Sequence, residues 1–151
     1  MDKITVEPVK NRNDLDGVVN LLADEELVQT VGLMLPRQKE NRILAIKIFI
    51  QKNHIMVVKL NEKVIGMIVL SNWYRDEGKR LLHHYELGYL LQRNQWNKGI
   101  MTFALRKVIS SLPSKIIIHA ECKKSNFRSQ RVLIKCGFTY EHDDLWQYIV
   151  E

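Results

Sequence analysis

The chain of 151 residues has 46% hydrophobic and 26% charged side chains and a formal net charge of +6. This length and composition are typical of one globular domain, and the apolar runs fall short of the roughly 18 residues that a membrane span needs. The N-terminus lacks a secretory apolar segment and the two cysteines lack metal-ligand spacing, so we expect a cytoplasmic protein with no metal and no membrane contact.

The predicted elements follow from the spacing of the apolar residues and from turn signals. In chain order we expect a strand (residues 4–9), a helix capped by Asn13, a helix (37–52), strands (54–60, 63–70 and 83–91), a helix (97–111), a strand (115–122), a helix (125–135) and two strands (138–142 and 145–150). The order β-α-α-β-β-β-α-β-α-β-β predicts one α/β (α+β) domain over residues 1–151, with a mixed sheet covered by helices.

Local signals set the ends of several elements. Asn13 is the expected N-cap of the first helix, whose buried face would include Val18 and Leu22. Gly137 is the expected residue at which the last helix ends. Residues 28–36 are expected to be irregular, and neither they nor residues 72–79 carry a pattern that names a ligand.

The most informative segment is residues 85–104, where a strand leads through a short polar loop directly into a helix. The exposed N–H groups and the positive dipole end of such a helix suit an anion, and a diphosphate in particular. Gly99 lets the backbone approach the ligand without a Cβ in the way, and Lys98 adds a positive charge. The segment is not a Walker A loop, because GxxxxGK[ST] is absent.

Two motifs at matching separation resemble one family. Residues 96–104, Trp-Asn-Lys-Gly-Ile-Met-Thr-Phe-Ala, resemble the pyrophosphate loop of the GNAT N-acetyltransferase superfamily, and are closest to the W-G-K-G-x-A-T-E-A of its ribosomal-protein N-acetyltransferase branch. Residues 126–138 resemble that branch's N-x-x-S-x-x-x-x-x-K-x-G-F. The resemblance implies a mostly antiparallel central sheet flanked by helices, acetyl-CoA as co-substrate, and transfer of acetyl to a primary amine.

The resemblance also assigns residues that would bind acetyl-CoA. Backbone groups of the strand would pair with the pantetheine arm, and the loop would hold the diphosphate. Asn126 would cap its helix, and the resemblance adds a hydrogen bond to pantetheine or to nearby backbone. These residues are Leu90, Gln92, Trp96, Asn97, Lys98, Gly99, Ile100, Met101, Thr102 and Asn126.

Three residues depart from the family's loop. Asn97 stands where the branch has Gly, and Asn is the least costly other residue if φ is positive there. Met101 stands at a Gly/Ala position and is expected to bring a bulky side chain near the phosphates, and Phe103 replaces Glu. These changes bear on the affinity for the cofactor more than on the fold.

The chemistry needs an amine that has lost its extra proton, because only a free lone pair attacks the thioester. The reference pKa is near 10.4 for a lysine-type amine and near 8 for an α-amine, so a base helps at neutral pH. By resemblance, Glu86 occupies the general-base position. The alternative is a solvated strand Glu or one that is paired with an Arg.

The departing thiolate benefits from a proton donor. Leu133 occupies the position of the tyrosine that many family members use, whereas Ser129 lies on the same helix face as Asn126 and is the available hydroxyl. The alternative is a serine that bonds to a backbone carbonyl. His83 and His84 face opposite ways and form no chelate.

The acceptor is left open by the sequence. Trp73, Tyr74 and Trp146 either line an acceptor cleft or pack in the core. The leading hypothesis is a protein N-terminal α-amine, and the alternatives are a small-molecule amine (a polyamine, amino sugar or amino acid) or a non-catalytic acyl-CoA-binding regulator. Nucleic acid is disfavoured, because the basic residues are interspersed with acidic ones. We expect a monomer or a homodimer.

Overall fold

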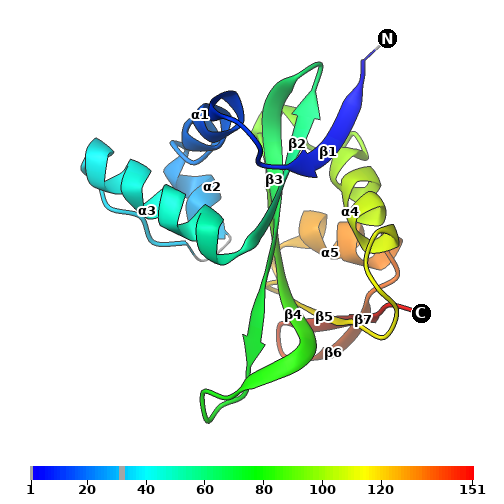
Figure 1. The fold of residues 1–151 in the computed structure, drawn as a ribbon. Helices are drawn as coiled ribbons and strands as arrows, with labels where there is room; N and C mark the ends of the chain where they lie inside the picture. Colours follow the sequence, from blue (N-terminus) through cyan, green and yellow to red (C-terminus); the bar gives the residue numbers. More distant parts are fainter. Residues whose placement is uncertain (1, 31–32) are drawn as a thin grey trace. The chain divides into compact units, whose positions relative to one another are not determined.

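The computed structural model describes residues 2–30 and 33–151. Within these residues, the strands form a sheet in the order β1-β2-β3-β4-β5-β7-β6 (Figure 1). The elements are β1 (Ile4–Pro8), α1 (Arg12–Leu21), α2 (Glu25–Thr30), α3 (Lys39–Lys52), β2 (His54–Leu60), β3 (Lys63–Tyr74), β4 (Arg80–Leu91), the 3-10 turn η1 (Arg93–Gln95), α4 (Ile100–Ser110), β5 (Ile117–Glu121), α5 (Phe127–Lys135), β6 (Thr139–His142) and β7 (Leu145–Ile149).

The pairing of the strands confirms the predicted mixed, mostly antiparallel sheet. β4 and β5 are parallel, whereas β1–β2, β5–β7 and β6–β7 are antiparallel. A parallel pair requires a long crossover between its strands, and η1 and α4 supply it. None of the described helices is both long and apolar enough to span a bilayer.

The chain divides into two compact units. Unit 1 comprises Met1–Val69 and Tyr89–Trp96, and unit 2 comprises Leu70–Gly88 and Asn97–Glu151. β3 and β4 each contribute residues to both units. The prediction of a single domain over residues 1–151 stays a prediction.

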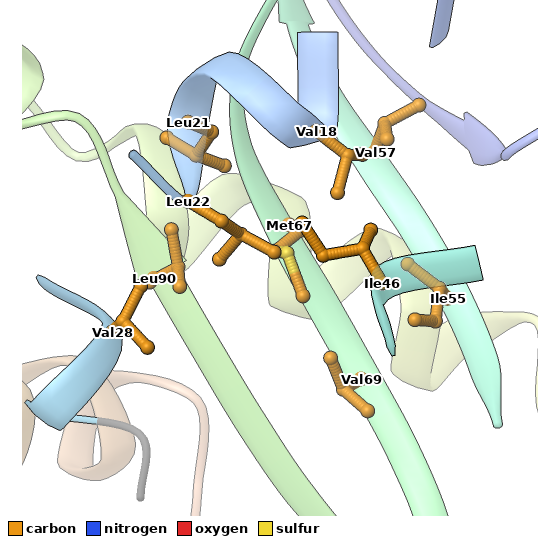
Figure 2. Packing of buried hydrophobic residues seen from close by; sticks show 10 residues of the cluster. All are labelled: Val18, Leu21, Leu22, Val28, Ile46, Ile55, Val57, Met67, Val69 and Leu90. Carbon is orange, nitrogen blue, oxygen red and sulfur yellow. The ribbon is translucent and has the colours of Figure 1, made fainter. Parts of the chain in front are cut away.

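Unit 1 is built around an apolar cluster between its helices and strands. Figure 2 shows Val18 of α1, Leu22 at the end of that helix and Ile46 of α3 directed toward Val57 of β2 and Met67 of β3. All five side chains are almost completely buried, which confirms the predicted apolar face of the first helix. Burial of such side chains is the main term that stabilises this unit.

The first helix begins two residues earlier than predicted. Asn11, not Asn13, is the N-cap, and its Oδ1 accepts the N–H of Asp14 at 2.9 Å. Both asparagines suit the cap by residue type. Asn11 is the N-cap because this start of the helix places Asp14 in the interior. There its carboxylate lies 2.7 Å from the Lys59 ammonium.

Helix α2 was not predicted. The expectation that residues 28–36 are irregular is wrong for residues 28–30, which end α2, and residues 31–32 lie outside the described residues. A helix of six residues is too short to show a clear apolar period. The described order therefore contains a third helix before β2.

Unit 2 has one buried and one open face on its strands. In the parallel register Leu87 pairs with Ala120, and both side chains are buried. The neighbouring pair, Glu86 and His119, faces the opposite way because side chains alternate along a strand, and both residues are half-buried. We call the face that carries Glu86 and His119 the open face of unit 2.

The end of α5 confirms one local prediction. Gly137 has φ 89°, its N–H donates to Ile134, and the N–H of Phe138 donates to Leu133. This is the Schellman arrangement, in which a glycine in the left-handed region ends the helix.

Candidate functional site

The loop before α4 provides a set of backbone N–H donors. The helix starts at Ile100, not at residue 97 as predicted, and its first internal bond runs from the N–H of Phe103 to the carbonyl of Gly99 at 3.1 Å. The N–H groups of Ile100, Met101 and Thr102 precede that bond, so no carbonyl four residues earlier in the helix accepts them. Gly99 places no side-chain cap there. An uncapped N-terminus of this kind fits a diphosphate.

The backbone of this loop explains two of its residues. Asn97 has φ 63° and Gly99 has φ 77°, both in the left-handed region. The expectation that Asn97 replaces Gly at a positive φ is therefore confirmed. A Cβ on Gly99 would meet no atom of residues 2–30 or 33–151 within 4 Å, so the glycine is required by its φ and the space above it is open to a ligand.

The side chain of Met101 points into the protein. Met101 and Thr102 are only 5% and 8% exposed and pack in the core of unit 2. The expectation that Met101 brings its side chain toward the phosphates is therefore wrong, and the residue offers its backbone N–H instead. Phe103 is exposed, and the Lys107 ammonium lies 5.4 Å from the centre of its ring.

Three of the predicted cofactor residues lie in unit 1, at the end of β4. The Gln92 N–H donates to the Ile65 carbonyl at 2.7 Å, and the Gln92 carbonyl accepts the Gln95 N–H at 2.9 Å, so both backbone groups of Gln92 are engaged within the protein. The Trp96 indole N–H donates to the Leu91 carbonyl at 2.7 Å and so ties down the chain that follows the strand. Leu90 is buried. Backbone pairing of Leu90 and Gln92 with pantetheine stays a prediction.

The start of α5 brings together Asn126, Ser129 and Cys122. Asn126 is the N-cap, and its Oδ1 accepts the Ser129 N–H at 3.2 Å. Burial raises the pKa of the Cys122 thiol, and a hydrogen bond with the Ser129 side chain partly opposes this effect. Cys122 also lies 3.7 Å from the Asn126 carbonyl. Only the fold brings Cys122 beside Ser129, because no spacing in the sequence links the two residues.

Glu86 lies on the open face of unit 2. Burial raises the pKa of its carboxyl group, and the nearby Glu121 carboxylate raises it further. None of the ion pairs among the described residues includes Glu86, so the alternative of an Arg partner is not supported. A carboxylate with a raised pKa and no counter-ion has the properties of a general base.

Beside Glu86 the open face carries a pair of histidines. His84 Nδ1 of β4 lies 2.8 Å from His119 Nε2 of β5, and the two rings are stacked. The indole of Trp73 stacks on His119 with centroids 4.2 Å apart. The sequence pointed to His84 but missed His119, because only the register of β4 on β5 brings them together.

The three aromatic residues proposed for an acceptor cleft do not share one. Trp73 stacks on His119, whereas Trp146 pairs with Ala120 on the opposite, buried face. Tyr74 is exposed. A cavity of about 350 Å³ contains none of the predicted catalytic or cofactor residues, and its lining is Cys122, Lys124, Gln130, Tyr140, Asp143 and Trp146.

In the described part of the chain, no group of three or more His, Cys, Asp or Glu side chains is arranged to hold a metal ion. The site consists of backbone donors, a helix N-cap and ionisable side chains. Such groups suit proton transfer and the binding of an anionic ligand.

Comparison of the sequence with protein families gives a match over most of the chain. The profile described as "Acetyltransferase (GNAT) domain" matches residues 3–139. The chain belongs to the GNAT acetyltransferase family. It is therefore an acetyl-CoA-dependent N-acetyltransferase, and the predicted family and co-substrate are confirmed. No curated protein matches the GNAT chain by sequence.

Solved structures of GNAT proteins share the fold. The ribosomal L7/L12 α-N-protein acetyltransferase RimL in complex with coenzyme A has a TM-score of 0.76 at 13% identity, and the match covers 97% of this chain and 94% of that chain. Spermidine N-acetyltransferase from Vibrio cholerae, in complex with CoA and spermine, has a TM-score of 0.75 at 14% identity, and the match covers 97% of this chain and 95% of that chain. Ribosomal-protein-S5-alanine acetyltransferase from Vibrio fischeri has a TM-score of 0.71 at 20% identity, and the match covers 98% of this chain and 93% of that chain.

Proposed function

We propose that this enzyme transfers the acetyl group of acetyl-CoA to a protein N-terminal α-amine by direct attack, with Glu86 as the general base. The observation that carries the proposal is the state of Glu86, a half-buried carboxyl on the open face with a raised pKa and no ion-pair partner among the described residues. A base of raised pKa accepts a proton from an amine more readily than a solvent-exposed Glu does.

The binding of acetyl-CoA is assigned to the loop before α4 and to the flanking residues predicted from the sequence. The N–H groups of Ile100, Met101 and Thr102 would hold the diphosphate, and Lys98 would add positive charge. Bound there, acetyl-CoA supplies the thioester that the amine attacks. The left-handed Gly99 supports this assignment, because it keeps a side chain out of the path of the phosphates.

Release of the thiolate is assigned to the start of α5. Ser129 is the third residue of the helix, where the positive end of the dipole favours a negative charge. Its hydroxyl is at present hydrogen-bonded to Cys122, and it would turn to the leaving sulfur to act as the proton donor. Asn126 supports Ser129 by accepting its N–H.

The basicity of the amine favours an N-terminal acceptor. At pH 7 roughly a tenth of an α-amine with a pKa near 8 is already unprotonated, whereas a lysine-type amine is roughly a thousandfold more protonated than unprotonated. An α-amine therefore depends less on deprotonation by Glu86 than a lysine-type amine does. Two structural relatives are named as acetyltransferases of ribosomal proteins, and the name of one of them specifies the α-amine.

A polyamine is the second candidate. Carboxylates of β4, β5 and β6 lie around the open face. Glu121 is close enough to raise the pKa of Glu86, and Glu141 is close enough to oppose the lowering of the pKa of His119. A cluster of this sign attracts a substrate that carries more than one ammonium group. One structural relative is a spermidine N-acetyltransferase.

An acceptor screen by mass spectrometry tests the proposal. The enzyme is incubated with acetyl-CoA and peptides that differ in the first residue, and in parallel with polyamines, amino sugars and amino acids. We expect a gain of one acetyl group at a peptide α-amine. Turnover of polyamines alone would favour the second candidate, and acetyl-CoA binding without any turnover would contradict both and favour a regulatory domain.

Gly99→Val tests the cofactor loop, with Gly99→Asn as its matched control. We expect Val to weaken acetyl-CoA binding at least tenfold, because a β-branched side chain disfavours the left-handed φ and fills the space before the helix. Asn tolerates this φ and should retain more affinity. Calorimetric titration measures the affinity, and thermal melting verifies the fold. Equal affinity in a folded Val variant would contradict the loop assignment.

A further inference from the structure

The hydrogen-bonded histidines on the open face lie next to the base, where a group is needed to remove the proton that Glu86 has accepted. We propose that His119 and His84 form a proton relay, which takes the proton that Glu86 receives from the amine and passes it toward solvent. This inference deepens the proposed function and rests on it. Glu86 and His119 are register partners on adjacent parallel strands, and His84 is 2.8 Å beyond His119.

The arrangement leads away from Glu86 toward water. Adjacent strands are about 4.8 Å apart, so side chains at paired positions on one face are within reach of each other directly or through one water. His84 precedes Glu86 by two residues on β4, in the direction of the hairpin tip, whose residues 75–79 are all exposed. His119 is therefore paired with the half-buried base on the neighbouring strand, and His84 lies beside His119 on the side of the exposed loop.

Burial and the neighbouring charges keep both histidine rings neutral, so each ring has an unprotonated nitrogen that can accept a proton. Burial lowers the pKa of His84, and the nearby Arg75 and His83 lower it further. Burial and His84 lower the pKa of His119, while Glu141 acts in the opposite direction. Arg75 and His83 therefore act on the pair from the hairpin loop and β4, and Glu141 acts from β6. Glu86 and Glu121 lie on the same face of β4 and β5, because side chains alternate along a strand. Trp73 covers His119 with an apolar ring.

The balance of the reaction shows why a relay is needed. An ammonium group R–NH3⁺ and acetyl-CoA become R–NH–CO–CH3, the free thiol of CoA and one proton. The nitrogen forms the C–N bond, the C–S bond breaks, and two protons leave the nitrogen. One of them ends on the sulfur. The other reaches Glu86, and the enzyme must release it before the next turnover.

The pair can move this proton without moving its rings. A proton that arrives at Nδ1 of His119 allows the proton on Nε2 to pass to Nδ1 of His84, and Nε2 of His84 then releases its own proton to water. The proton leaves an O–H bond of Glu86 and ends in an O–H bond of water, only N–H bonds change between these two steps, and no oxidant or further reactant is required. Exchange with water returns the two rings to their first tautomers.

His119→Gln and His84→Asn test the relay, because each amide places a hydrogen-bonding atom near the ring nitrogen that it replaces. Neither amide accepts and releases a proton at neutral pH. We expect kcat with the acceptor found in the screen to fall about tenfold at pH 7, which is less than the roughly 100-fold or more that a direct general acid or base contributes, because the pair acts after Glu86. The KM for acetyl-CoA should stay unchanged. The deficit should shrink as the pH approaches the pKa of the amine, since the nucleophile is then already unprotonated.

Added imidazole separates a relay from a packing role. In both variants we expect imidazole to restore kcat, as a diffusible base that replaces the missing ring, and to leave the wild type unchanged. His142→Gln is the matched control, because His142 is an exposed histidine of the same unit paired with Asp143, and should behave as the wild type. Thermal melting verifies that each variant is folded.

Each other outcome decides against the relay in a distinct way. Wild-type kcat in both variants over the whole pH range overturns the relay and leaves the proposed function intact. A deficit that is independent of pH and that imidazole does not restore means that the pair only packs. If the wild type acetylates no amine of the screen, the proposed function fails and the relay fails with it.

Discussion

Two clusters of ionisable side chains, one in each unit, are buried in opposite electrostatic states. In unit 1, Lys59 lies 2.7 Å from Asp14 and 2.6 Å from Glu7. Hydrogen bonds with these carboxylates raise the pKa of Lys59, and the Lys59 bond lowers the pKa of Glu7. In unit 2, burial raises the pKa of Glu86 and lowers that of His119. The first cluster favours charged groups and the second favours neutral ones.

The difference separates a structural role from a functional one. Buried charges that are paired are tied to the fold, since removal of one partner leaves the other unpaired. Buried ionisable groups without a counter-ion reduce stability, and proteins retain them mainly where proton transfer needs a shifted pKa. The Lys59 cluster links β1, β2 and α1, whereas Glu86 and the histidines face outward from β4 and β5.

The largest expected effect is the loss of stability in Lys59→Met. Asp14 is almost completely buried, so its carboxylate would be left without a counter-ion, and we expect the free energy of unfolding to fall by about 3–5 kcal/mol. The double variant Lys59→Met with Asp14→Asn should recover part of this loss. Denaturant unfolding measures it. A loss below about 1 kcal/mol would mean that the pair is not structural, and would remove the contrast between the clusters.

The next effect is on the rate of Glu86→Gln. We expect kcat/KM at pH 7 to fall about 100-fold, because the amide cannot accept the amine proton. Above the pKa of the amine the variant should approach the wild type. Initial rates over pH 6–10, with Glu121→Gln as the control for the loss of a neighbouring carboxylate, measure this profile. A wild-type rate at pH 7 would remove Glu86 as the base.

The smallest effect is on the stability of the same variant. The folded pKa of Glu86 is raised, so its charge destabilises the fold above that pKa, and the penalty disappears as the pH falls through it toward the unfolded value near 4.5. Glu86→Gln should therefore be more stable than the wild type at pH 7, by about 0.5 kcal/mol after screening by water, and equal to it near pH 4. Thermal melting at both pH values measures the difference. A destabilised variant at pH 7 would place Glu86 with the structural cluster.

Local features were the part of the structure that the sequence predicted well. The left-handed φ of Asn97, the Gly137 end of α5 and the Asn126 N-cap each depend on a few neighbouring residues. The choice of Asn11 over Asn13 was missed because it depends on where Asp14 is buried. The separation of Trp73 from Trp146 was missed because it depends on the pairing of β5 with β7.

The sequence by itself determined the family, the loop that begins α4 and the identity of the candidate base, since motif spacing and backbone preference are properties of short segments. Only the tertiary structure decided that Glu86 is half-buried with no ion-pair partner in the described part of the chain, and that His84 and His119 share a hydrogen bond. The physical reason is that burial and strand register are set by residues far apart in the chain, and a side chain takes its pKa from those surroundings rather than from its neighbours in sequence.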